Sequence, residues 1–454
     1  MLIRFTIENV FSFGERKEFN MLPYGRLGTL KHHLYKVNNF NVLKMASIYG
    51  ANGAGKSNLI KALQHFQNLV LNENVTGNER NIAFKFNDAS QSQLFVVEFI
   101  QDNIPFYYGI EVFEGLILTE ELYESGLGIK EDKLIFERKT TKEGKVSIQF
   151  MDAFENDLRS QVLKSILLEE FIKPKELILK ILSNRENQFL QIIKKVFRWF
   201  EKTLNIITPE SKPRALAHRV DVDTNFRHYA ESLMCSFNIG ITSLNTEKKH
   251  IRDFFGIDNE NELKKLILEL EQSPNNMIGI TSRRGDEIII VKEEEEVFVK
   301  RLKVGHLGKR NQLKLFNLEE VSDGTIRLLD FIPALQNILS TQKVFIIDEI
   351  ERSIHPLLIK ELIRKVSLDE NTKGQLIFTT HESNLLDQKI FRQDEIWFVE
   401  KDKNGSTDLY ALSDFKREHN TINIQKGYLN GRYGSIPFLA NLTDLNWQEY
   451  VINE

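Results

Sequence analysis

The stretch that decides the fold is Val42–Tyr49, VLKMASIY, which runs directly into Gly50–Ser57, GANGAGKS. The first part is a compact apolar segment, and after the second part apolar residues recur at helical spacing from Leu59 to Val70. The middle part fits the pattern G-x-x-x-x-G-K-[ST] without a mismatch. Strand, glycine loop and helix therefore follow in the order that a phosphate-binding loop requires, and this order predicts an α/β fold.

The loop has a specific expected chemistry. Its glycines let backbone N–H groups turn inward around phosphates, which the N-terminus of the following helix also attracts. Lys56 is expected on the β- and γ-phosphates, and the Ser57 hydroxyl on Mg²⁺. The nucleotide-binding residues that we expect here are Gly50, Asn52, Gly53, Gly55, Lys56 and Ser57. The motif indicates a nucleoside triphosphate but not the purpose of its hydrolysis.

An acidic pair supplies the expected second half of the site. Val344–Ile347 is a four-residue apolar run that predicts a strand buried on both faces, and Asp348 follows at its carboxyl end, where ligands bind in open α/β sheets. Asp348 is expected to hold Mg²⁺, directly or through water. Glu349 is expected to orient and deprotonate the attacking water, which makes it a catalytic residue. An apolar strand that ends in Asp-Glu is common in proteins, so this pair indicates a nucleotide site only in combination with the phosphate loop.

Two further segments carry candidate site residues. Ser322 and Gly324 stand just before an expected helix, where a hydroxyl, backbone N–H groups and the positive end of a helix dipole suit a γ-phosphate. An ordinary N-cap serine followed by a loop glycine gives the same pattern. His381 follows the next expected buried strand, Gln375–Phe378, where it is placed to hydrogen-bond the γ-phosphate.

The patterning predicts three parts. Strand-like patterns run from Ile82 to Phe136 and again from Met277 to Leu318. Between them, helical spacing dominates Met151–Leu204 and Asn225–Leu270, the latter with interruptions near Gly240 and Gly256. Strands and helices then alternate from Glu319, which favours a mainly parallel sheet. The expected parts are a first lobe with the phosphate loop and an antiparallel β subdomain (1–140), a largely helical insertion (141–275) and a second lobe (276–454).

Composition excludes several classes of protein. Hydrophobic residues make up 41% of the 454 residues, too many for an intrinsically disordered chain. The 60 basic and 64 acidic residues give a net charge of −4, which leaves no global signature of nucleic-acid binding. The single cysteine, Cys235, excludes an intramolecular disulfide framework and a cysteine-based zinc site. Without a secretory signal or a long apolar run, we expect a cytoplasmic protein with no membrane partner.

The order of these motifs resembles the ABC-type ATPase heads of the SMC, RecF and OLD group. A narrower resemblance is to prokaryotic AAA-type ATPases of phage-defence operons, including Rlo-type, abortive-infection and PARIS ATPase subunits. The segments that carry it are Glu320–Leu329, Ile347–Pro356, Asp394–Glu400 and the C-terminal Tyr428–Pro437, YLNGRYGSIP. The expected fold is therefore an ABC-type ATPase head, with a phosphate loop, a mainly parallel sheet, an antiparallel β subdomain and a largely helical insertion.

This resemblance implies that ATP and Mg²⁺ are the cofactors and that the heads form a homodimer or a higher homo-oligomer. In such an assembly Ser322 and Gly324 act in trans on the nucleotide held by Lys56 of a second subunit. The resemblance also implies that Ser353–Pro356 lies at that interface and that His381 is the switch histidine.

The sequence departs from the family pattern in three places. Asp323 and Thr325 stand where the transporter-type signature has Gly and Gln. For the glutamine loop, Gln91 and Gln93 are only candidates. Asn9–Phe13 contains none of the arginines that touch nucleotide in many SMC-like heads.

The first functional hypothesis is an ATPase subunit of an anti-phage defence system, in which ATP-dependent association of heads controls an effector. A separate nuclease domain does not fit in the segment after His381. The toxin or nuclease activity is therefore expected on another protein.

The alternative is a RecF- or SMC-like DNA-binding ATPase in DNA repair. It needs a basic path for the phosphate backbone, and Lys300–Lys303, Lys309–Arg310 and Lys248–Lys249 are candidate clusters, although such clusters are more often a solvated surface. A nucleotide-binding subunit of a membrane transporter is the weaker third reading, because the segment between Lys56 and Ser322 greatly exceeds the helical subdomain of those modules.

Overall fold

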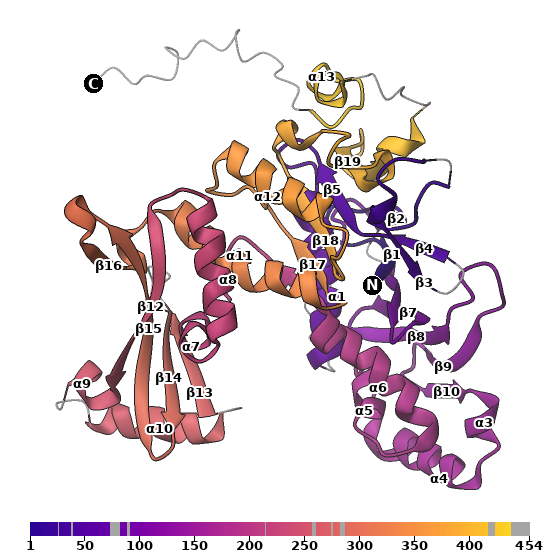
Figure 1. The fold of residues 1–454 in the computed structure, drawn as a ribbon. Coiled ribbons are helices and arrows are strands. Elements are labelled where there is room, and N and C mark those ends of the chain that lie inside the picture. Colours follow the sequence, from indigo (N-terminus) through magenta and orange to yellow (C-terminus); the bar gives the residue numbers. More distant parts are fainter. Residues whose placement is uncertain are drawn as a thin grey trace, which may run out of the picture. The chain divides into compact units, whose positions relative to one another are not determined.

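The computed structural model describes ten segments of the chain, which Figure 1 shows as a ribbon. They are residues 1–25, 27–37, 40–72, 82–88, 91–213, 215–256, 260–273, 276–281, 287–415 and 423–436. The contacts divide the chain into two compact units. Unit 1 comprises Met1–Thr208, Ser340–Ile350 and Ile363–Glu454, and unit 2 comprises Pro209–Leu339 and Glu351–Leu362.

Unit 1 contains a six-stranded sheet in the order β11-β17-β18-β5-β19-β20. Its strands are β11 (Leu204–Ile207), β17 (Val344–Ile347), β18 (Gln375–Thr380), β5 (Met45–Tyr49), β19 (Ile396–Lys401) and β20 (Thr407–Ala411). All neighbours are parallel except β19 and β20, which are antiparallel. The residues of β5, β17 and β18 are all buried, which is typical of parallel strands covered on both faces. The predicted mainly parallel sheet is confirmed.

A second sheet of unit 1 is antiparallel, as expected, with seven strands in the order β10-β9-β8-β7-β6-β1-β2. These are β10 (Val146–Phe150), β9 (Lys133–Thr140), β8 (Leu116–Glu124), β7 (Ile104–Phe113), β6 (Gln93–Gln101), β1 (Leu2–Glu8) and β2 (Lys17–Asn20). The short strands β3 (Leu34–Val37) and β4 (Phe40–Leu43) form a separate antiparallel pair.

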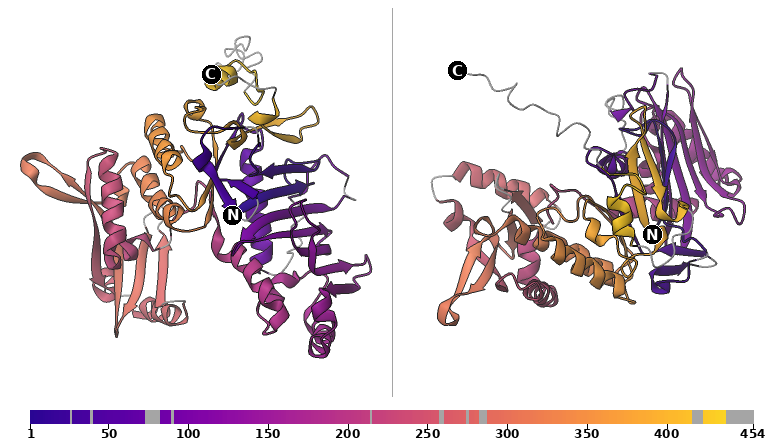
Figure 2. Two further views of the ribbon diagram at one scale, coloured as in Figure 1. Left: turned by 45° about the vertical axis from the view of Figure 1, so that its right-hand side comes forward. Right: turned by 90° about the horizontal axis from the view of Figure 1, so that it is seen from above.

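Helix α1 (Lys56–Asn72) begins at the end of the phosphate loop and packs against the antiparallel sheet. The Phe66 ring lies 5.5 Å from that of Phe95 on β6 and 5.7 Å from that of Tyr108 on β7. The other α-helices of unit 1 are α3 (Asp152–Glu155), α4 (Leu158–Ile166), α5 (Ile178–Ser183), α6 (Gln191–Arg198) and α13 (Ile424–Leu429). Helices α3 to α6 gather beside the β9–β10 end of the sheet (Figures 1 and 2).

Unit 2 combines helices with a five-stranded antiparallel sheet. The strands follow the order β12-β15-β14-β13, and β16 pairs with β15. They are β12 (Ile241–His250), β13 (Met277–Thr281), β14 (Glu287–Glu293), β15 (Glu296–Leu307) and β16 (Leu313–Asn317). The helices are α7 (Leu216–Val222), α8 (Thr224–Ser236), α9 (Ile251–Phe255), α10 (Glu260–Gln272) and α11 (Asp323–Ser340), whereas α12 (Pro356–Leu368) belongs partly to each unit.

The boundaries of the two units differ from the boundaries of the three parts that we predicted. Residues 141–275 are largely helical, but they include the strands β10, β11 and β12. Because β11 pairs in parallel with β17, it returns the chain to the central sheet of unit 1, and helices α3 to α6 remain in that unit. The boundaries at 140/141 and 275/276 stay predictions.

Of the helices in the described part of the chain, none combines the length and the apolar character that crossing a lipid bilayer demands.

Candidate functional site

The predicted site residues of unit 1 follow three neighbouring parallel strands. The loop Gly50–Gly55 follows β5, His381 follows β18, and Asp348 follows β17. Because β18 lies between β5 and β17, the carboxyl ends of all three strands meet at one edge of the sheet (Figure 1). The structure therefore brings together the phosphate loop, the acidic pair and His381, which are far apart in the sequence.

The backbone of the loop explains where glycine is required. Gly53 has φ +76° and Gly55 has φ +119°, in the left-handed region that L side chains rarely adopt. A Cβ atom on Gly55 would also overlap the Thr407 side chain on β20 and lie 3.0 Å from Ser12 Oγ. Thr407 Oγ1 lies 2.7 Å from Ser12 Oγ and 3.0 Å from the carbonyl oxygen of Ala54. The hydroxyl groups of Thr407 and Ser12 therefore pack against the loop and support its conformation, which the motif alone does not reveal.

Lys56 is buried, and its ammonium group is folded onto the loop. Its Nζ donates to the carbonyl oxygens of Gly50 at 2.8 Å and Ala51 at 3.2 Å, and lies 3.4 Å from Nδ1 of the exposed His381. Since an ammonium group only donates, a close Nδ1 acts as the acceptor, which places the imidazole proton on Nε2. The ammonium group of Lys56 therefore lies beside the first residues of the phosphate loop, where phosphate oxygens can replace the carbonyl oxygens of Gly50 and Ala51 as its acceptors.

The acidic pair is fixed by a residue that sequence reasoning missed. Thr379 Oγ1, at the end of β18, donates to Asp348 Oδ1 at 2.5 Å and accepts from the Glu349 N–H at 2.8 Å. Ser57 Oγ also donates to Asp348 Oδ1, at 3.2 Å. Glu349 adopts φ 50°, a conformation that costs free energy for a residue with a side chain and persists where neighbours enforce it. Thr379 is therefore the link that holds both acids.

The donor set fits the expected metal. The Ser57 hydroxyl and the Asp348 carboxylate offer oxygen atoms close to each other, and oxygen is the ligand that Mg²⁺ prefers. Mg²⁺ normally keeps several water molecules and completes its shell with substrate phosphates, so few protein ligands are needed.

Ser322 and Gly324 belong to unit 2, where they form the start of α11. Ser322 is exposed, and its Oγ accepts from the Thr325 N–H at 3.2 Å, the usual bond of an N-cap serine. Gly324 lies against the carbonyl oxygen of Ser353, so that a Cβ atom there would approach it to 2.5 Å. Ser353 has φ 63°. Ser322 therefore acts as an ordinary helix N-cap within unit 2, as the alternative interpretation expects. Contact of Ser322 and Gly324 with a nucleotide stays a prediction.

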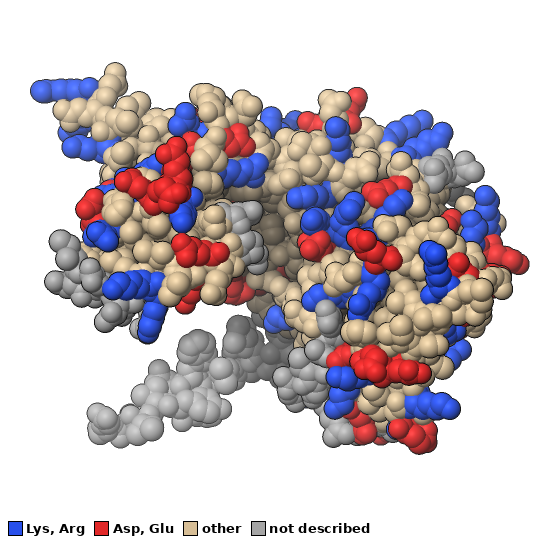
Figure 3. All heavy atoms as spheres, turned by 90° about the horizontal axis from the view of Figure 1, so that it is seen from below, with Lys and Arg blue, Asp and Glu red and all other residues tan. Residues whose placement is uncertain are grey.

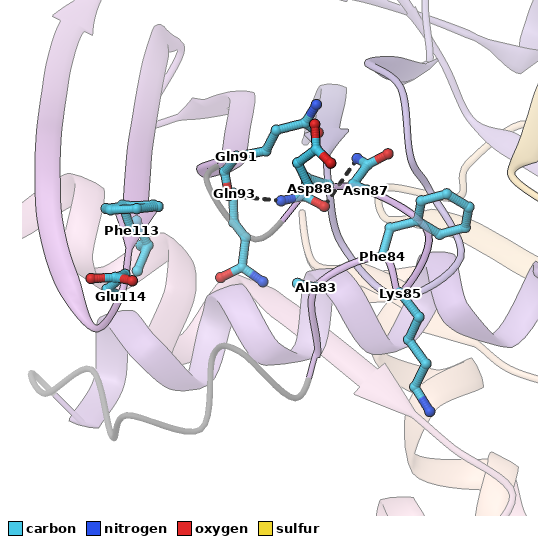
Figure 4. A pocket seen from close by; sticks show the side chains of 11 residues that line it. Ala83, Phe84, Lys85, Asn87, Asp88, Gln91, Gln93, Phe113 and Glu114 are labelled. Atoms are coloured by element: carbon cyan, nitrogen blue, oxygen red, sulfur yellow. Dashed lines mark hydrogen bonds between the residues drawn. The ribbon is translucent and has the colours of Figure 1, made fainter.

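The candidates for a glutamine loop, Gln91 and Gln93, line a pocket of about 400 Å³ together with Phe84, Asn87 and Glu114 (Figure 4). The Asn9 side chain ties this region together, because it donates to the carbonyl oxygen of Gln91 at 2.9 Å and accepts from Asn87 Nδ2 at 3.1 Å. The residues that line this pocket do not include those of the phosphate loop. The assignment of a glutamine loop stays a prediction.

Comparison with known proteins gives one family and a set of distant folds. The family described as "AAA domain, putative AbiEii toxin, Type IV TA system" matches residues 45–387, a range that includes the phosphate loop, Ser322, Asp348 and His381. A comparison with curated proteins found no match.

The similar solved structures are SMC heads. They are an SMC head bound to the C-terminal winged-helix domain of ScpA (12% identity, TM-score 0.41, covering 90% of this chain and 97% of that one); the SMC head domain from Thermotoga maritima (11%, 0.37, 90% and 98%); and an SMC head with an extended coiled coil bound to the C-terminal domain of ScpA derived from Pyrococcus furiosus (12%, 0.39, 95% and 98%). At these scores, the likenesses carry no argument about the site.

Proposed function

The chain belongs to the AAA-domain family of putative AbiEii toxins of type IV toxin–antitoxin systems, and we propose that it binds ATP with Mg²⁺ and hydrolyses ATP to ADP and phosphate. The observation that carries this proposal is the meeting of the phosphate loop, the acidic pair and His381 at one edge of the parallel sheet. A loop of this kind, a buried lysine and a neighbouring Asp-Glu pair are the parts that phosphoryl transfer needs, because it depends mostly on positioning and charge stabilisation.

In this proposal the N–H groups of Gly53–Ser57 and the N-terminus of α1 bind the phosphates. Lys56 exchanges its two carbonyl partners for β- and γ-phosphate oxygens. Ser57 and Asp348 hold Mg²⁺, which neutralises charge on the phosphate oxygens. Glu349 orients the attacking water and takes its proton, while His381 contacts the γ-phosphate beside Lys56.

Replacing Lys56 tests nucleotide binding directly. Lys56→Ala is expected to weaken ATP affinity roughly 10- to 100-fold, because a hydrogen bond to a charged group contributes about 1.5–3 kcal/mol. Isothermal titration with ATP and Mg²⁺ measures the change, and Lys61→Ala on the exposed face of the same helix is the matched control. An unchanged affinity in the Lys56→Ala protein would remove the phosphate-loop assignment.

We also infer that two copies share each ATP site, with Ser322 and Gly324 of one copy completing the site that contains Lys56 of the other. The family resemblance supports this, as does the exposure of Ser322 at a helix N-terminus.

Mixing two inactive variants tests the shared site. A Lys56→Ala chain mixed in equal amount with a Ser322→Arg chain is expected to recover about a quarter of the parental ATPase activity, because half of the dimers are mixed and each then has one intact site. Each variant alone serves as the control. If no mixture of the folded chains regains activity, the two copies do not share their sites.

The broader role that we propose is in anti-phage defence, where ATP-dependent association of heads controls a separate toxin or nuclease. The resemblance of Glu320–Leu329, Ile347–Pro356 and Tyr428–Pro437 to ATPase subunits of phage-defence operons supports it. A nuclease or toxin that co-purifies with the chain and is released on ATP hydrolysis would be the direct test.

Ion pairs within unit 2 reduce the basic surface that the DNA-binding alternative requires. Most of the lysines in the predicted clusters are neutralised there. The pairs are Lys300–Asp221, Lys303–Glu247, Lys248–Glu293 and Lys249–Glu247. Lys309 and Arg310 remain exposed in the turn between β15 and β16. On the face that Figure 3 shows, blue basic and red acidic side chains are interspersed. Affinity for duplex DNA that falls steeply with salt would favour this alternative.

A further inference from the structure

The C-terminal segment Asn423–Ile436 contains all but the last residue of Tyr428–Pro437, the motif that strengthens the narrower family resemblance, yet the chemistry proposed above gives this segment no role. The segment begins with α13, whose N-cap Asn423 accepts from the Lys426 N–H at 2.9 Å. Its position in unit 1 is beside the site rather than away from it, because three of its residues line the same cavity as the phosphate loop and His381.

The segment is tightly fixed to the central sheet. Gly427 lies against the ring of Tyr433, where a Cβ atom would approach Cε2 to 2.8 Å. The Ser435 N–H donates to Glu400 Oε2 on β19 at 3.1 Å, and the Tyr410 hydroxyl on β20 donates to the Tyr433 carbonyl oxygen at 2.8 Å. Such close packing leaves the segment one conformation over β19 and β20.

Tyr428 attaches α13 to the point where a strand becomes the phosphate loop. Its ring stacks on Phe398 at 5.8 Å and meets Tyr49 edge-on at 5.9 Å. Its hydroxyl donates to the Ser435 carbonyl oxygen at 3.1 Å. Since Tyr49 is the last residue of β5 and Gly50 opens the loop, α13 buttresses the entrance to the loop.

Gln425 attaches the same helix to the loop that carries His381. Its Nε2 donates to Ser383 Oγ at 3.3 Å, two residues beyond the histidine. A cavity of about 620 Å³ lies between these parts. Its lining residues are Gly50, Ala51, Asn52, His381, Ser383, Tyr428, Leu429 and Ile436. The buried Tyr428 thus faces the same cavity as the first loop residues and His381.

We propose that Gln425 is a positioning residue of the ATP site: it holds the His381 loop through Ser383, while its helix α13 packs through Tyr428 against Tyr49 at the start of the phosphate loop. This inference rests on the proposed ATPase function. His381 is exposed on a short loop, so little of its surroundings fixes its position. Catalysis requires reacting groups to be placed to well within about 1 Å, so such a loop needs an additional contact that holds it. Helix α13 is hydrogen-bonded to the His381 loop and packs at the start of the phosphate loop, so it fixes the positions of these two loops relative to each other.

Steady-state kinetics of point variants test the proposal. Gln425→Ala and Ser383→Ala are each expected to lower kcat about 2- to 10-fold while KM for ATP changes less than about 2-fold, because a neutral hydrogen bond contributes about 1 kcal/mol. The Gln425→Ala/Ser383→Ala double variant is expected to lose no more than either single variant. Lys426→Ala, which changes an exposed residue of the same helix, is the matched control and should leave kcat unchanged.

A second measurement does not require hydrolysis. In the nucleotide-free protein, backbone hydrogen exchange of residues 50–57 and 378–385 is expected to accelerate in Gln425→Ala but not in Lys426→Ala, with equal melting temperatures. Exchange and kcat that match the control, or losses that multiply in the double variant, would overturn the positioning role. Hydrolysis that does not depend on Lys56 would instead overturn the proposed function, and the exchange result would still decide whether α13 holds these loops.

Discussion

Glu349→Gln is expected to keep ATP and Mg²⁺ bound while slowing hydrolysis by roughly 10²- to 10⁴-fold, the usual contribution of a positioned general base. The amide has nearly the shape of the carboxylate but cannot take the proton of the attacking water. The backbone of residue 349 keeps its bond to Thr379 Oγ1, so the left-handed conformation at this position is retained. Phosphate release in a single turnover measures the rate, and titration with a non-hydrolysable ATP analogue measures binding.

Two control variants separate the loss of the base from a disturbed site. Glu361→Gln makes the same chemical change on an exposed position of α12 and should have no effect. Thr379→Val removes the hydroxyl that holds both acids, so we expect an intermediate loss of about 10-fold in kcat. Hydrolysis by Glu349→Gln at the parental rate would show that another group takes the proton.

Under the proposed shared site, Glu349→Gln also stabilises the ATP-bound association of two copies, because the step that ends it is blocked. Sedimentation with ATP and Mg²⁺ is expected to show a larger species for this variant, and the Ser322→Arg/Glu349→Gln double variant should remain at the size of the nucleotide-free protein. A double variant that still associates would show that Ser322 is not in the interface.

The positions of the loop, the acids and the histidine could be predicted because each follows a short buried strand whose apolar run is visible in the sequence. The contribution of Thr379 could not, because it depends on the register of two strands: Ile347 of β17 lies opposite Phe378 of β18. Only this register places the residue after Phe378 next to Asp348. The bond from Thr379 to the Glu349 N–H is likewise a product of the sheet order and not of any motif.

The helical reading of Asn225–Leu270 was wrong in its middle, where β12 runs from Ile241 to His250. This strand has few apolar residues, and its sequence ITSLNTEKKH has neither a helical nor a strongly alternating pattern. Its nine paired residues along β15 stabilise it instead, so a tertiary contact overrides weak local preference.

A buried, hydrogen-bonded pair of a histidine and a glutamate, which no motif indicates, gives the largest expected effect on stability. His33 and Glu395 are both fully buried, with His33 Nδ1 2.9 Å from each carboxylate oxygen. His33 Nε2 lies 2.9 Å from the Ser367 carbonyl oxygen and 3.1 Å from its Oγ. The imidazole therefore joins the segment just before β3, helix α12 and the residue before β19 through one side chain.

His33→Ala is expected to lower the free energy of unfolding of unit 1 by about 3–5 kcal/mol, because it leaves a buried carboxylate without its partner. Burial raises the pKa of Glu395 above its ordinary value of 4.5, and His33 opposes that rise. Without His33 the pKa rises further, so the folded variant is most stable with Glu395 protonated. Its deficit should shrink as the pH falls toward 4.5 and be largest above the raised pKa.

Urea unfolding followed by tryptophan fluorescence measures the deficit of unit 1, which contains Trp199 and Trp397. His228→Ala is the matched control, because that side chain is 70% exposed. The His33→Ala/Glu395→Leu double variant is expected to regain much of the loss, since an apolar side chain has no charge to desolvate. If the single variant loses less than about 1 kcal/mol at neutral pH, or if the double variant is less stable than the single one, His33 does not stabilise unit 1 by satisfying the buried carboxyl group of Glu395. The same loss at pH 4.5 and pH 8 would show that packing of the imidazole, rather than its charge, stabilises this part of unit 1.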